Sequence, residues 1–231
     1  MILDHGCDAI SCCLLTLSVS SLLGLSKRMQ ALMLAINAFL FFMANLEQYF
    51  THYLYLPKIN AVSEGLWGIA VMCMVSPLLG GQAFWLSTPL GFPNNWFVVF
   101  IPLFTMVLNM IGHTRNILEK VDARKYIEGM QFPLAWVLIL IQSYWLGGIQ
   151  DYSLMYVYSF NISKGTIICQ ISHCTGKVFN PYRILNIVQI ALMAISAISA
   201  CAGKSIDGIN GILCTVAIID FGYFAWVVCT R

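Results

Sequence analysis

Charged residues are scarce in this sequence of 231 residues. They make up 10% of the chain, whereas about 25% is usual in a soluble domain, and hydrophobic residues reach 59%. The 12 Lys and Arg against 10 Asp and Glu leave a net charge of only +2, too small and too scattered for a nucleic-acid-binding face. The composition excludes an ordinary soluble domain, argues against nucleic acid as a partner, and indicates an integral membrane protein.

Neither paired cysteine spacings nor the pattern of a signal peptide is visible in the sequence. The nine cysteines include no C-x-x-C pair and lie mostly within apolar runs, which favours buried thiols over a zinc or disulfide framework. The first apolar run follows an acidic stretch, Asp4 to Asp8, instead of the positive segment that opens a signal peptide. We therefore expect the first helix to remain in the protein.

Long hydrophobic runs are what the sequence has in abundance. A bilayer core about 30 Å thick requires about 20 mostly apolar residues per helix. Eight runs near that length are separated by charges, glycines and prolines, over approximately residues 9–26, 29–50, 65–80, 96–112, 131–149, 152–172, 184–202 and 209–229. The pattern predicts one all-α transmembrane domain over residues 1–231, with about eight helices.

The positive charges gather on one side of these helices. Eight of the 12 Lys and Arg fall on the side of the N-terminus and three on the other, and the positive-inside rule then places the N-terminus in the cytoplasm. All four histidines and seven of the ten acids lie on or near that side, including the loop 51–64 and the charged connection 113–129. This connection is compatible with an interfacial helix. We expect function at the cytoplasmic membrane surface.

Four residues outside the motifs have an open interpretation. For His113 and His173 the sequence favours ordinary histidines at the headgroup level. Lys164 and Asp220 fall inside predicted helices, where a charge is costly and usually faces a polar cavity or a partner. These two are candidates for a functional site without an assigned role.

The string D-H-G-C-D at residues 4–8 opens the first helix, and its two aspartates are four residues apart. That spacing places both carboxylates on one helical face, where a divalent cation with a preference for oxygen ligands would neutralise them. From spacing alone, the better interpretation is that Asp4 and Asp8 are acids at the start of a helix, a position that the helix dipole favours. The string, however, resembles the second half of the CDP-alcohol phosphatidyltransferase motif, D-x2-D-G-x2-A-R-x8-G-x3-D-x3-D, in the form found in its choline/ethanolamine phosphotransferase branch.

A second stretch extends the resemblance. Glu47, Tyr49 and His52, then Leu-Tyr-Leu at 54–56, then Asn60 and Glu64, resemble the branch's W-E-x-Y-H-T-x-x-L-x-L followed by N-G-P-x-E-G. The first half of the family motif is absent, and the Gly-Pro pair is replaced by Ala-Val at 61–62. Because the family has ten helices and carries the missing residues on the first two, the chain resembles a member that starts at the third helix.

The resemblance implies an activity and a set of roles. It implies transfer of phosphocholine or phosphoethanolamine from CDP-choline or CDP-ethanolamine to diacylglycerol, with release of CMP, at an endoplasmic reticulum or Golgi membrane and on its cytoplasmic side. Mg²⁺ or Mn²⁺ would bridge the diphosphate. The implied roles are metal binding for Asp4, metal binding or proton acceptance for Asp8, general base for His5, and substrate contacts for Glu47, Tyr49, His52, Asn60 and Glu64. A homodimer is a further expectation.

Two alternatives stay open at this stage. The chain could be a catalytically inactive relative that binds lipid or a partner, because Met1 stands where the branch usually has the glutamate that would orient His5. A transporter also fits eight helices with intramembrane charges. It is the weakest interpretation, because the polar residues gather at one face instead of at the midplane.

Overall fold

The computed structural model describes residues 2–53, 63–145, 151–202 and 207–230. It contains eight long helices and one short one: α1 (Ile2–Leu22), α2 (Lys27–Thr51), α3 (Ser63–Leu78), α4 (Gln82–Leu86), α5 (Asn95–Leu118), α6 (Ala123–Trp145), α7 (Ser153–Thr175), α8 (Ile184–Cys201) and α9 (Asp207–Thr230). Within these ranges there is no strand. The predicted all-α fold is confirmed, and the long helices coincide with the eight predicted runs.

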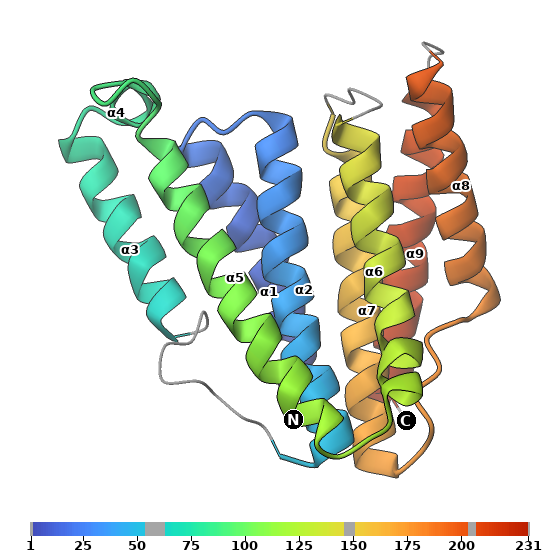
Figure 1. Cartoon of the computed structure of the whole chain (residues 1–231). Helices are drawn as coiled ribbons and strands as arrows, with labels where there is room; N and C mark the ends of the chain where they lie inside the picture. The colour runs from blue at the N-terminus through green and yellow to red at the C-terminus, as the bar shows by residue number, and fades with distance from the viewer. Residues whose placement is uncertain (1, 54–62, 146–150, 203–206, 231) are drawn as a thin grey trace.

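The helices stand side by side, with α3 at one edge of the bundle and α8 at the other (Figure 1). The N-terminus, the end of α2, the turn after α5 and the loop after α7 share one end of the bundle (Figure 1). Left-handed backbone closes two of these helices: His52 ends α2 at φ 60°, and Gly176 ends α7 at φ 65°.

The surface is apolar where lipid would surround it. Large side chains on the outer helices are mostly exposed, such as Trp67 on α3 (74%), Phe104 on α5 (67%) and Trp226 on α9 (63%). Among the described residues, α1, α2, α5 and α9 are long and apolar enough to cross a membrane, and α3 and α8 contain shorter apolar stretches. Exposed apolar faces on this scale are expected for a protein solvated by acyl chains.

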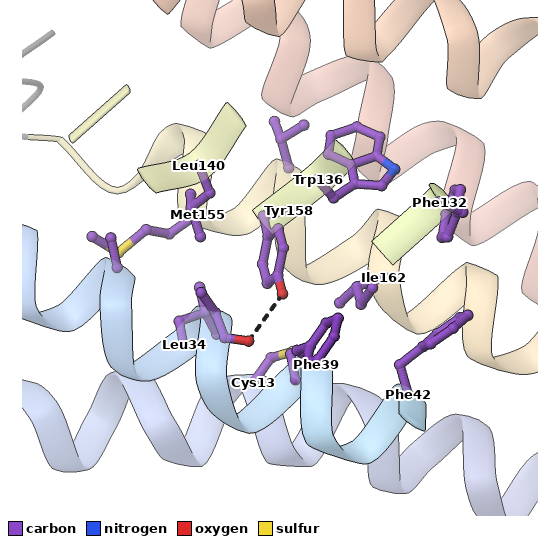
Figure 2. Packing of buried hydrophobic residues seen from close by; sticks show 14 of the residues in the cluster. Cys13, Leu34, Phe39, Phe42, Phe132, Trp136, Leu140, Met155, Tyr158 and Ile162 are labelled. Atoms are coloured by element: carbon purple, nitrogen blue, oxygen red, sulfur yellow. Dashed lines mark hydrogen bonds between the residues drawn. The ribbon is translucent and has the colours of Figure 1, made fainter. Parts of the chain in front are cut away.

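The core lies between α2, α6 and α7, with α1 packed beneath them. Figure 2 shows Phe39 and Phe42 of α2 beside Phe132 of α6 and Tyr158 of α7. The hydroxyl of Tyr158 donates to the Ala35 carbonyl at 3.3 Å and so joins α7 to α2 (Figure 2). Because α7 is mostly surrounded by other helices, its interior position tolerates more polar residues than a lipid-facing helix would.

One expectation about the connections is wrong. Residues 113–129 do not form a separate interfacial helix: α5 continues to Leu118, and α6 begins at Ala123 after a short turn. Exposed ion pairs one turn apart, Arg115 with Glu119 at 3.2 Å and Arg124 with Glu128 at 3.1 Å, are consistent with this extension, although each contributes only a few tenths of a kcal/mol.

Gly165 lets α7 approach α6 closely. A Cβ atom built on Gly165 would lie 2.2 Å from a ring carbon of Phe132, whose side chain is fully buried. We expect Gly165→Ala to lower the free energy of unfolding by about 1–3 kcal/mol, because the ring must move within a packed core. The control is Gly112→Ala on α5, where nothing lies within 4 Å and helix propensity predicts a gain of up to about 1 kcal/mol. Equal stability of both variants in thermal unfolding would contradict this packing.

Candidate functional site

The D-H-G-C-D string occupies the first two turns of α1. Asp4 and Asp8 are exposed on the same helical face, as their spacing predicts, and His5 between them is half-buried. Gly6 points the other way, toward α7, where a Cβ atom would lie 3.1 Å from Ile167. The packing of α1 on α7 therefore turns both carboxylates outward at the end of the bundle.

These carboxylates fit part of a divalent-cation site. Their oxygens are the ligands that Mg²⁺ and Mn²⁺ prefer, and Mg²⁺ is commonly held by one or two carboxylates together with substrate phosphates and water. In the described part of the chain, however, no group of three or more His, Cys, Asp or Glu side chains converges. Any cation here would therefore take most of its ligands from elsewhere.

Glu47 lies in an environment that the sequence did not predict. The predicted run 29–50 already places Glu47 within a helix, but no pattern predicts its neighbours: it lies on α2 and is 1% exposed against α5. Its Oε2 atom lies 2.5 Å from His113 Nδ1, and its Oε1 atom accepts a hydrogen bond from Asn116 Nδ2 at 2.6 Å. Both carboxylate oxygens already accept a bond and the side chain is buried, so Glu47 is not accessible to a substrate in this arrangement.

His113 is therefore more than a headgroup-level histidine. It is only 6% exposed and forms a buried pair with Glu47, 66 residues away in the sequence. A hydrogen bond to a carboxylate holds an imidazole in one orientation and is stronger than a bond between neutral groups. No local pattern in the sequence marks this pair, because it depends on how α5 packs on α2.

Tyr49 and His52 lie near the end of α2 and face the loop after α7. The Tyr49 hydroxyl accepts a hydrogen bond from the Phe179 amide at 3.0 Å, and the His52 ring lies 5.4 Å from the His173 ring. In register with Glu47, the histidine of the W-E-x-Y-H-T stretch corresponds to Phe50 and not to His52. The motif therefore gives His52 no family role. Asn60 lies outside the described residues, as does the side chain of Glu64.

Lys164 and Asp220 are partners, as expected for charges inside a bundle. Lys164 Nζ lies 2.5 Å from Asp220 Oδ2 and 3.2 Å from Asn186 Oδ1, and Gln189 Nε2 donates to the same aspartate oxygen at 3.2 Å. Asn161 donates to Gln189 Oε1 at 2.5 Å. The polar network thus joins α7, α8 and α9 in the interior.

The fold and these side chains define an all-helical membrane protein that presents two carboxylates and an imidazole at one end of its bundle. No protein-family model matches the chain. It is 30% identical over 167 residues to Choline/ethanolaminephosphotransferase 1 of Arabidopsis thaliana, an alignment that covers 71% of this chain and 40% of the relative.

Two further relatives agree. Choline/ethanolaminephosphotransferase 2 of Arabidopsis thaliana is 36% identical over 117 residues, which cover 50% of this chain and 28% of the relative. An uncharacterized CDP-alcohol phosphatidyltransferase class-I family protein of Dictyostelium discoideum is 28% identical over 166 residues, which cover 61% of this chain and 41% of the relative. The chain spans about two fifths or less of each relative. The resemblance to CDP-alcohol phosphatidyltransferases is confirmed over that part.

Proposed function

We propose that this chain carries one half of the active site of a CDP-alcohol phosphotransferase of the choline/ethanolamine type. The reaction transfers phosphocholine or phosphoethanolamine from its CDP ester to the hydroxyl of diacylglycerol and releases CMP. The observation that carries the proposal is the outward-facing pair Asp4 and Asp8, with His5 between them, in a chain similar to enzymes with that name. We place this end of the bundle at the cytoplasmic surface of an endoplasmic reticulum or Golgi membrane.

Each residue has a role that its position allows. Asp4 and Asp8 would hold Mg²⁺ or Mn²⁺, which when bound neutralises the diphosphate charge and stabilises the leaving phosphate. Asp8 or the half-buried His5 would accept the proton of the diacylglycerol hydroxyl, because both lie beside the exposed face. The buried pair of Glu47 and His113 would hold the ends of α2 and α5 in place around the same end of the bundle.

A second candidate function rests on the ligand count. Two aspartates alone hold a cation weakly, and no third ligand converges on them in the described residues. This observation favours an inactive relative that binds lipid or a partner chain.

Metal removal distinguishes the two functions. The test uses the chain preceded by a segment bearing D-x2-D-G-x2-A-R, in liposomes with diacylglycerol and labelled CDP-ethanolamine or CDP-choline. We expect labelled phospholipid with Mg²⁺ or Mn²⁺, loss of product with a chelator, and recovery when the cation is returned. The 231-residue chain alone should form little or no product, because carboxylate ligands act as a unit. Absence of product from both proteins under every condition would contradict the phosphotransferase and support the inactive relative.

A further inference from the structure

A cavity of about 570 Å³ opens between the end of α2, the start of α6 and the loop after α7. Part of its wall is aromatic, formed by Tyr49, Phe50, Phe179 and Tyr182. The end of α2, the start of α6 and the loop after α7 lie at the end of the bundle that also holds the N-terminus (Figure 1). The Asp4–Asp8 string does not line it, so the cavity is separate from the carboxylates of the proposed active site.

The charge around this cavity is positive. Lys125 of α6 and Lys177 of the loop line it, and neither forms an ion pair among the described residues. The acidic residue in the lining is Glu128, and its Oε1 atom already accepts a hydrogen bond from Arg124 at 3.1 Å. Two exposed lysines therefore line the cavity, and neither has a carboxylate partner among the described residues.

One lining residue, His173, also has a polar atom that lacks a partner in the described part of the chain. His173 Nδ1 is buried and has no hydrogen bond within the described residues. Burial and, to a lesser extent, the neighbouring His52 lower the pKa of His173, so its ring is neutral near pH 7 and can donate or accept one further bond. A buried polar atom of this kind is costly unless a ligand or water satisfies it.

The surrounding backbone holds these groups in place. The Tyr49 hydroxyl accepts from the Phe179 amide at 3.0 Å and lies 3.5 Å from the Lys177 carbonyl, so it fixes the loop that carries Lys177. His52 has a left-handed backbone with φ 60°, a conformation that costs a non-glycine residue about 1 kcal/mol or more. Strain of this kind is often found beside ligands.

We propose that this cavity binds a phosphate group, carried by a lipid headgroup or present as a free phosphate. Lys125 and Lys177 would pair with its charge, because a lysine ammonium acts as a point charge toward phosphate. His173 Nδ1 would bond to one of its oxygens. The aromatic wall would pack against the apolar part of an amphiphile at the membrane surface. This binding does not depend on the proposed phosphotransfer.

The test uses the full 231-residue chain in phosphatidylcholine liposomes that contain photoactivatable phosphatidic acid. We expect crosslinks in the peptides that contain 121–131 and 172–182. We also expect an affinity roughly 30-fold lower in a Lys125→Gln/Lys177→Gln variant, because each lysine that pairs with the bound phosphate contributes about a factor of five. Each single variant should bind about fivefold more weakly, and these two variants serve as the test if the double variant folds poorly. Lys120→Gln is the matched control: Lys120 lies in the same region of the chain but outside the cavity lining.

The source of the phosphate follows from competition with inorganic phosphate. Inhibition of crosslinking by added phosphate, with direct binding of phosphate to the chain in neutral liposomes, identifies a free anion as ligand. Crosslinking that resists added phosphate identifies the lipid headgroup. Equal crosslinking of the Lys125→Gln/Lys177→Gln and Lys120→Gln variants, or labelling confined to other helices, would overturn the proposal.

Discussion

Replacing Asp220 with Ala is expected to lower the free energy of unfolding by about 3–5 kcal/mol. The Lys164 side chain is 3% exposed, and its ammonium would retain only Asn186 Oδ1 as a close oxygen partner among the described residues. A buried charge without its counter-ion bears most of its desolvation cost uncompensated. Gln189 would lose an acceptor at the same time. The measurement is unfolding in detergent, followed by circular dichroism.

The control for this prediction removes both charges. Lys164→Met combined with Asp220→Leu should be close to the wild type in stability, because well-packed apolar residues often replace a buried ion pair without loss. The two single variants and the double variant form a cycle that isolates the pair. A loss below about 1 kcal/mol for Asp220→Ala would show that the ion pair contributes little. A double variant as unstable as the single one would show that the loss does not come from an unpaired charge.

The sequence predicts the helices well because the bilayer imposes their length. Runs of about 20 apolar residues separated by charges leave few alternatives to a helix, since unpaired backbone groups are costly in lipid. The sequence defines the helix boundaries less well where charged residues stand at the helix ends. The charges in the segment 113–129 indicate a connection, whereas salt bridges one turn apart also suit the continuing ends of α5 and α6.

The sequence predicts only those features of the site that depend on residues close together in the chain. The shared face of Asp4 and Asp8 follows from helical geometry within a single turn. The pairing of Glu47 with His113 and of Lys164 with Asp220 depends on helix packing over 66 and 56 residues, which no spacing rule encodes. The approach of the His52 ring to the His173 ring likewise depends on how α2 packs beside α7.

Asp8→Asn should reduce phosphotransfer by about 10²–10⁴-fold, the range that a positioned general base contributes. The amide keeps the shape of the side chain but removes its negative charge, so it can neither accept a proton nor neutralise a cation. Asp8 is exposed and lies on the face of α1 that turns away from α7. The substitution should therefore leave the stability of the bundle within about 0.5 kcal/mol of the wild type.

The most direct test of the central claim is the rate at which labelled phospholipid forms from CDP-ethanolamine and diacylglycerol in liposomes with Mg²⁺. The chain, preceded by a segment bearing D-x2-D-G-x2-A-R, is compared with its Asp8→Asn and Ser18→Ala variants. Ser18 is exposed on α1, and its hydroxyl bonds to the Leu14 carbonyl of the same helix at 2.8 Å. We expect wild-type rates for Ser18→Ala and a loss of at least about 10²-fold for Asp8→Asn. Equal rates for all three proteins, or no product from any of them, would contradict the assignment of the Asp4–Asp8 string to catalysis.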